Sequence, residues 1–325
     1  MTFTGRGLYA ASSKVPRGRR SGWLVIGAVV ALAVLLGGAL AAFGSVQVGG
    51  DTRSDDFTGA KKVEIHSGSG VDVEVHRVEG DAVTVERTLR GTPLAEPRER
   101  LDMDGGTVKA EVSCSGSWFF SGCEIEYSVG VPEGTAVAVE ATSGDIELAG
   151  TTGGVDAESA SGSISGENLS GGIHAATTTG DIDLSGVEGD LDVETNTGSV
   201  DAEGSGGTVT AETTTGRMDL DEFTAERFDI ETTTGGVELD AGFAEARIET
   251  TTGSVDVEAV EEFRRLDVDT TTGSVEVQVP EGAYRVTGDS ATGDRDIDVE
   301  TSADGGGPQI AVSTTTGSVE VRADD

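Results

Sequence analysis

A pattern of apolar and polar residues repeats at nearly constant intervals through the C-terminal half of the chain. Each repeat contains a short run of threonine or serine followed by a glycine, and the run Thr-Thr-Thr-Gly occurs six times. Successive marker glycines are 18 to 24 residues apart. Self-similarity at such a period is typical of stacked repeat proteins. The ten marker glycines are Gly144, Gly162, Gly180, Gly198, Gly216, Gly235, Gly253, Gly273, Gly293 and Gly317.

Apolar residues stand at fixed positions relative to each marker glycine. The position seven residues before the glycine is apolar in all ten repeats, and the position two residues after it is apolar in nine, with Arg295 as the exception. Alternation of apolar and polar residues at period two predicts strands with one buried face. The β-branched residues at these positions argue against helices. Each repeat therefore predicts one coil, made of a strand, a glycine bend, a second strand and a short return.

The predicted fold class is all-β: a parallel single-stack β-solenoid (β-helix) of about ten coils of 18–20 residues, over residues 136–325. Strands pair at about 4.8 Å, so such a stack would be on the order of 50 Å long. Inward threonine and serine hydroxyls beside the glycine are expected to form ladders, each hydroxyl donating to the next. Residues 63–135 keep the alternation without the period, which predicts an irregular β cap. Residues 44–62 are expected to be a flexible tether.

The N-terminal residues predict a membrane anchor. Residues 23–43 contain no charged side chain, and about 20 apolar residues are enough to cross a bilayer as a helix. Residues 1–22 contain five basic and no acidic side chains, which predicts a cytoplasmic leader. The chain is therefore expected to be a single-pass cell-membrane protein that contacts the lipid bilayer through residues 23–43. A cleaved signal peptide is the alternative, because Ala39-Leu40-Ala41 offers a cleavage site. Both interpretations place the repeats outside the cytoplasm.

The two cysteines, Cys114 and Cys123, enclose a loop of glycine, serine and three aromatic residues. Outside the cytoplasm, two nearby cysteines are expected to form a disulfide. A metal site is the less favoured alternative, because no histidine or third cysteine is close in sequence. The aromatic residues Trp118, Phe119 and Phe120 are either a binding tip or a small cluster packed beneath its own hairpin.

The charge of the chain is strongly acidic, with 59 Asp and Glu against 22 Lys and Arg and a net charge of −37. This balance excludes a nucleic-acid binder, which needs a basic face. Acidic residues recur four positions before the glycine in eight repeats and three positions after it in nine. Stacking would align them as two ladders in which neighbouring carboxylates repel by roughly 1 kcal/mol in water.

Two interpretations of these ladders remain open. They are either a solvated acidic face or a weak, multi-site binding surface for Ca²⁺ or Mg²⁺, which prefer carboxylate oxygens. On the second interpretation, the predicted cation ligands are Asp183, Asp201, Asp219, Glu238, Asp256 and Glu276.

The sequence contains no arrangement typical of an enzyme. The three histidines, His66, His76 and His174, are far apart, and each stands in a strand-like segment. Every coil repeats the same carboxylates, so no pair is distinguished as acid and base. No long insertion is present to build a substrate cleft. We therefore expect no catalytic residue, no bound cofactor and no small-molecule substrate.

The basic N-terminus, the single apolar span, the Cys-x8-Cys loop and the repeated (S/T)-x-G-x-V-x-V units resemble the bacterial β-strand-repeat envelope family. The resemblance covers residues 60–325, most firmly 137–321. That family has no assigned function, its members are often labelled adhesins, and some are linked with envelope stress systems. The resemblance implies a non-catalytic adhesion, interaction or scaffold module that contacts an envelope protein or a cell-wall polymer. The alternative is a sensory or regulatory accessory protein that acts through a membrane partner.

Overall fold

The computed structural model describes residues 48–91, 95–116, 123–302 and 306–324. These residues form 25 strands and, within the described ranges, no helix, so the predicted all-β class is confirmed. No described helix is therefore long and apolar enough to span a bilayer. The predicted leader at 1–22 and the predicted span at 23–43 lie outside the described residues.

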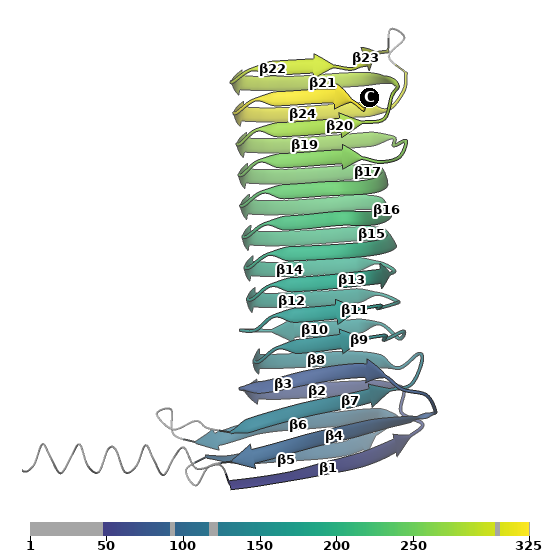
Figure 1. Ribbon diagram of the computed structural model, residues 1–325, viewed down its shortest axis with the longest axis vertical. Helices are drawn as coiled ribbons and strands as arrows, with labels where there is room; N and C mark the ends of the chain where they lie inside the picture. The colour runs from purple at the N-terminus through teal and green to yellow at the C-terminus, as the bar shows by residue number, and fades with distance from the viewer. Residues whose placement is uncertain (1–47, 92–94, 117–122, 303–305, 325) are drawn as a thin grey trace, which may run out of the picture. The chain divides into compact units, whose positions relative to one another are not determined.

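The repeats form a stack of coils, each with two strands joined at a marker glycine (Figure 1). Neighbouring coils pair in parallel and in register: Val155 of β10 lies beside Val137 of β8 on one side and Ile173 of β12 on the other. The parallel pairing agrees with the predicted solenoid. The strands of this central stack are β8 (Ala136–Ser143), β9 (Ile146–Ala149), β10 (Val155–Ser159), β11 (Ile164–Glu167), β12 (Ile173–Thr179), β13 (Ile182–Glu188), β14 (Leu191–Thr197), β15 (Val200–Thr215), β16 (Met218–Thr234), β17 (Val237–Thr252), β18 (Val255–Ala259), β19 (Arg265–Thr272) and β20 (Val275–Val279).

The interior of the stack is a narrow apolar core. Alternate residues of both strands of a coil are buried, as in β10 and β11. Where the returns are longer, one edge of the core contains a continuous series of aromatic rings, with neighbouring ring centroids 5.3–6.3 Å apart. These rings occupy positions that carry smaller apolar residues in earlier coils, as Phe228 lies beside Val209. They belong to Phe223, Phe228, Phe243, Phe263 and Tyr284.

The bends require glycine because successive coils approach each other too closely there for a side chain. A Cβ atom at Gly235 would overlap the carbonyl oxygen of Gly216, and one at Gly253 would overlap the carbonyl oxygen of Gly235. Except at Gly293 in the outermost coil, the amide of the bend glycine donates to the coil stacked on it, as Gly235 does to Thr252 O at 2.9 Å. The marker glycine is therefore a packing requirement of the stack.

The inward threonines do not form the predicted hydroxyl ladder. In four coils the hydroxyl donates instead to the carbonyl oxygen of the bend glycine in the neighbouring coil, as Thr177 does to Gly162 at 3.0 Å and Thr314 to Gly273 at 3.1 Å. The hydroxyls of Thr213, Thr232 and Thr250 are buried without a hydrogen-bond partner. The expectation was wrong because, in the four coils with a bond, the bend carbonyl oxygen accepts the hydrogen that the predicted ladder would have placed on the next hydroxyl. These bonds join the side-chain column to the backbone.

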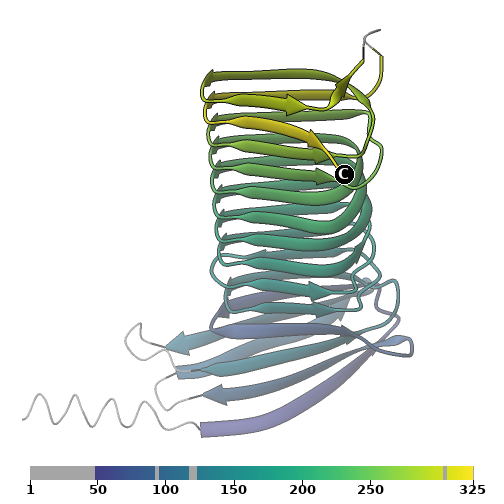
Figure 2. The ribbon, with the colours of Figure 1, turned by 45° about the horizontal axis from the view of Figure 1, so that its top comes forward.

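The C-terminal coils are stacked out of sequence order. Strands β24 (Gln309–Thr316) and β25 (Val319–Ala323) pair with β19 and β20 on one side and with β21 (Ala283–Thr292) and β22 (Arg295–Asp298) on the other. The last coil in the sequence is therefore inserted beneath the penultimate one, as Figures 1 and 2 show. The short β23 (Glu300–Thr301) pairs with β21 on the side away from β24.

The outermost coil contains the residues that break the repeat pattern. Arg295 occupies a usually apolar inward position and is exposed, and Gly288 stands where other coils have a small or apolar residue. A Cβ at Gly288 would lie 3.2 Å from the Nε atom of Arg295. Since no described coil covers this end, an inward position there borders solvent, and a charged side chain is tolerated.

The N-terminal end is also stacked out of order. Strands β2 (Lys62–Ser69) and β3 (Val71–Arg77) form a coil between β8–β9 and the strands β6 (Thr107–Gly116) and β7 (Glu124–Val131). We call this N-terminal part of the structure, strands β1 to β7, the base. Three antiparallel strands complete it: β4 pairs with β7, β5 pairs with β6, and β1 pairs with β4. Their bounds are Val48–Thr58 for β1, Ala82–Gly91 for β4 and Ala95–Asp104 for β5.

This base differs from two expectations. The segment expected as a tether, 44–62, contains the edge strand β1 and the first residue of β2. Strand β1 has no apolar alternation that would reveal it, because backbone pairing to β4 holds it in place. The segment expected as an irregular cap contributes two parallel coils, β2–β3 and β6–β7. The coil β2–β3 lacks the marker spacing because residues 78–135 intervene before its neighbour β8.

Candidate functional site

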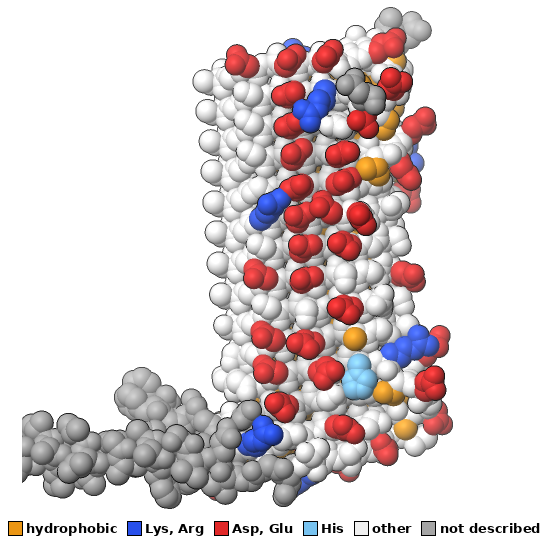
Figure 3. All heavy atoms as spheres, in the orientation of Figure 1, with side chains coloured by type: hydrophobic (Ala, Val, Ile, Leu, Met, Phe, Trp, Pro, Cys, Tyr) orange, Lys and Arg blue, Asp and Glu red, His pale blue; other side chains and the backbone are white. Residues whose placement is uncertain are grey.

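Two rows of carboxylates run along the stack, as predicted. We call the row on the strands after each bend the second-strand row; its members are in direct register, Asp201 beside both Asp183 and Asp219. The register continues through Glu238, Asp256 and Glu276. The structure therefore brings all six predicted residues into one line. Figure 3 shows such columns of acidic side chains on one face of the molecule.

The first-strand row stands on the strands before each bend. Its members also pair in register, as Glu212 does with Glu194 and Glu231. The row borders a groove along the stack whose lining also includes exposed threonines, among them Thr214 and Thr233. The row is interrupted at Ala176, between Glu158 and Glu194. It consists of Glu140, Glu158, Glu194, Glu212, Glu231, Glu249 and Asp269.

The carboxylates raise one another's pKa values. Partial burial raises the pKa of Asp201, and the neighbouring Asp219 and Asp183 add to the rise. In the first-strand row, burial and then Glu194 and Glu231 raise the pKa of Glu212. A raised pKa means that the ionised form is disfavoured in the folded protein. Both rows are therefore sites where a positive charge would be stabilised.

Asp221 is the most perturbed acid outside the two rows. Burial raises its pKa to about 6, and Asp219, two residues away on the same face of β16, adds to the rise. One carboxylate oxygen of each residue is buried without a hydrogen-bond partner. Sequence reasoning missed this pair because Asp221 stands outside both periodic positions.

Basic side chains neutralise the two rows unequally. Arg217 lies 3.5 Å from Asp219 and also pairs with Glu238, and Arg322 pairs with Glu276 in the same second-strand row. In the first-strand row, Arg247 pairs with Glu249. Glu194, Glu212 and Glu231 form no ion pair with any described residue. The repulsion between these three neighbours is therefore not offset by a basic side chain.

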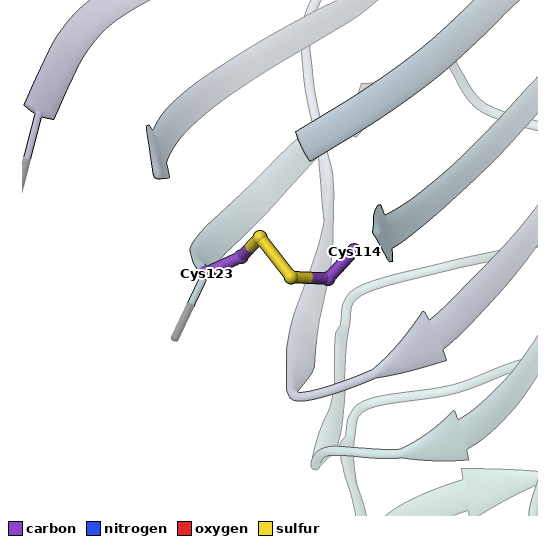
Figure 4. The surroundings of a disulfide bond; sticks show 2 residues. All are labelled: Cys114 and Cys123. Carbon is purple, nitrogen blue, oxygen red and sulfur yellow. A yellow bond between two sulfur atoms is a disulfide. The ribbon is translucent and has the colours of Figure 1, made fainter. Parts of the chain in front are cut away.

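The predicted disulfide between Cys114 and Cys123 is confirmed (Figure 4). The two Cα atoms are 5.9 Å apart, at the end of β6 and just before β7. The bond links the end of β6 to the start of β7, the two strands of one coil of the base. The aromatic residues Trp118, Phe119 and Phe120 lie outside the described residues.

A buried polar cluster joins the strands of the base. The hydroxyl of Tyr127 donates to Glu99 at 2.5 Å, and the buried Arg87 pairs with Glu99 and lies 2.6 Å from Asp55. Burial, and then Glu99, raise the pKa of the Tyr127 hydroxyl. The cluster closes the apolar core at this end. Sequence reasoning missed it because antiparallel β4 and β5 lie outside the repeat.

The family to which the chain belongs follows from a profile match over residues 60–323, which covers the whole stack and the base except β1. The chain belongs to the Toastrack DUF4097 family. This confirms the expected relation to a β-strand-repeat family without an assigned function. No curated protein matches the chain.

Solved structures related to this Toastrack protein are distant. A "putative adhesin" from Parabacteroides merdae is 12% identical with a TM-score of 0.47, covering 84% of this chain and 96% of its own. A "putative lipid binding protein" from Parabacteroides distasonis is 12% identical with a TM-score of 0.44, covering 85% and 97%. A "putative adhesin" from Bacteroides fragilis is 10% identical with a TM-score of 0.39, covering 86% and 98%. Such values are too low to assign a function.

Proposed function

We propose that this Toastrack protein is a non-catalytic adhesion or scaffold module, anchored in the cell membrane through residues 23–43, with its stack outside the cytoplasm. The observation that carries the proposal is the uninterrupted register of unneutralised carboxylates from Glu194 to Glu231. Every coil there presents the same surface, so the stack offers a repeated binding face in place of one pocket.

The chemistry of the rows defines the kind of partner. Carboxylates aligned about 5 Å apart attract polymers or proteins with repeated positive charges. They also take up Ca²⁺ or Mg²⁺ weakly, and a shared divalent cation can bridge them to an anionic wall polymer. We therefore propose an envelope protein or a cell-wall polymer as the partner, with contacts that depend on salt and divalent ions.

The proposal is tested with the purified full chain in detergent, in a binding screen against cell-wall polymers and envelope proteins with and without millimolar Mg²⁺. Binding that changes with Mg²⁺ and weakens when Glu194, Glu212 and Glu231 are all changed to Gln supports it. A matched control changes Glu79, Glu281 and Asp104, three exposed acids outside the rows, to their amides. Equal binding by both triple variants would exclude the rows as the contact surface.

A separate experiment tests the proposed location. Protease added to intact cells should remove the stack and leave the N-terminal leader protected. Full protection of the stack until the cells are lysed would place it in the cytoplasm and overturn the proposed location.

A further inference from the structure

His174 occupies a singular position on the first-strand face. It points outward from β12, directly between Asp156 on β10 and Asp192 on β14 in the parallel register. Its Nδ1 atom lies 3.2 Å from Oδ2 of Asp192. Among the described coils of the central stack, this is the only one with an imidazole on this face. The acidic surface therefore contains one nitrogen ligand at one level of the stack.

The acidic row is interrupted at the same coil. Ala176, two residues after His174, stands in register between Glu158 and Glu194 and carries no carboxylate. The imidazole therefore lies between acidic residues of the two neighbouring coils. Its own coil has no acidic residue in the first-strand row, because Ala176 occupies that position. Asp156, Glu158 and His174 each bring one ligand atom within 4.8 Å of the others.

We propose that Asp156, Glu158 and His174 bind one divalent transition-metal ion, with zinc as the representative ion. Zinc accepts histidine nitrogen and carboxylate oxygen at about 2.0–2.2 Å in a tetrahedron, which places its ligand atoms about 3.3 Å apart. The three donor atoms lie within 4.8 Å of one another without an ion, so metal binding would draw them closer together. Imidazole favours zinc, copper and nickel, whereas Ca²⁺ and Mg²⁺ prefer oxygen ligands alone.

Asp192 is a positioning residue in this arrangement. When Nδ1–H of His174 donates to Asp192, the neutral ring keeps its lone pair on Nε2, which is then the metal ligand. A carboxylate that holds the second nitrogen of a metal-binding histidine fixes the ring and increases its basicity. The remaining zinc coordination position is open to water or to a group from a partner.

This site shares Glu158 with the first-strand row, but it does not rest on the proposed function, which is carried by Glu194, Glu212 and Glu231. The rows present equivalent oxygen ligands at many levels, whereas the His174 site is single and contains nitrogen. The two are separated experimentally by adding millimolar Mg²⁺, which occupies oxygen-only sites, before zinc is titrated.

The test is a titration of the purified full chain with Zn²⁺ against a chromophoric chelator, in millimolar Mg²⁺. We expect one zinc ion per chain bound more tightly than any other. His174→Ala should weaken this binding by about a hundredfold, and Asp192→Asn should weaken it by about tenfold. The matched control is His66→Ala, which removes an exposed histidine that also lies beside an acid, Glu140, at 2.9 Å. This control should bind zinc as the unaltered chain does.

Two results would overturn the proposal. One is zinc binding by the unaltered chain that Mg²⁺ abolishes entirely, which would reduce the site to part of the acidic rows. The other is equal zinc affinity in His174→Ala and His66→Ala. Circular dichroism of each variant establishes that the stack is folded, so that lost affinity is assigned to the lost ligand.

Discussion

At the scale of single residues, the bend glycines are the positions where the stack tolerates least change. We expect Gly235→Ala to destabilise the protein by about 3 kcal/mol or more, because its Cβ would overlap the Gly216 carbonyl oxygen and force the coils apart. The next residue supplies the control: a Cβ at Gly236 would have no contact closer than 3.5 Å. Urea unfolding should show a cost below about 1 kcal/mol for Gly236→Ala. Equal costs for the two variants would refute the close-packing explanation of the bend.

The raised pKa of Asp221, about 6, predicts the direction of a pH effect. The unfolded value is near 4, so folding favours the protonated form, and the stability from this group is present below pH 4 and is lost as the pH rises through about 6. Asp221→Asn should therefore raise the melting temperature at pH 7 by about 1–3 °C and flatten its pH dependence between 4 and 6. Melting curves across this range provide the measurement. Asp104→Asn, at an exposed position away from the rows, should leave the pH dependence unchanged; a flattening of equal size in both variants would contradict the assignment.

At the level of strands and coils, the order of stacking at the C-terminal end determines which coils a core substitution should open. Ile310 of β24 and Val286 of β21 occupy equivalent inward positions and lie side by side. Because β24 lies inside β21, Ile310→Asp should expose both outer coils to solvent, whereas Val286→Asp should open only β21 and β22. Burial of an unpaired charge makes the inner change the costlier one.

Hydrogen exchange resolved by peptide measures this difference. The expected pattern is rapid exchange over β21, β22, β24 and β25 in the Ile310 variant and over β21 and β22 alone in the Val286 variant. If Val286→Asp also opened β24 and β25 while Ile310→Asp left β21 protected, the coils would be stacked in sequence order.

The disulfide of the base is a local constraint. Closing a loop of this length stabilises by about 2.5–3 kcal/mol in the chain-entropy model. Changing Cys114 and Cys123 to Ser should therefore speed hydrogen exchange in β6 and β7 while β12–β19 keep their protection, since repeat stability is largely a sum over neighbouring coils. Loss of protection throughout the central stack would show instead that the base is required for the stack to fold.

The central coils could be predicted from the sequence because their pairing is local. Each coil pairs with the next in the chain, so the period fixes the register, and the positions of Asp201 and Asp219 follow from counting residues from a glycine. The two ends could not be predicted in this way. A strand such as β24 has the same alternation as β21, and the order of their stacking depends on which coil covers the open end of the core. Only Gly288 and Arg295 indicate that β21 and β22 are outermost.

The candidate surface was predictable to a similar extent. The rows follow from the period, but the neutralising arginines do not. Arg217 stands next to a marker glycine, and it forms an ion pair with Glu238 on the neighbouring coil. The buried Arg87–Glu99 pair joins antiparallel strands outside the repeat. In both cases the partner is determined by the fold, because the two residues share no fixed spacing in the sequence.

Across the whole molecule, like charges repel one another along the stack. The net charge of −37 is arranged in rows, and the part of the first-strand row from Glu194 to Glu231 has no basic partner in the described structure. Repulsion of roughly 1 kcal/mol between neighbours in water is larger near a protein surface. Cations that bind the folded stack should relieve this stress and stabilise it.

The most direct test compares the melting temperature of three proteins as Mg²⁺ is raised at low ionic strength: the unaltered chain, the triple variant of Glu194, Glu212 and Glu231 to Gln, and the control triple variant of Glu79, Asp104 and Glu281. We expect the row variant to melt at a higher temperature without Mg²⁺ and to gain little from it, while the other two proteins rise together by several degrees. A row variant that melts lower than the unaltered chain and responds to Mg²⁺ as strongly as the control would contradict the claim that the carboxylate rows govern this molecule.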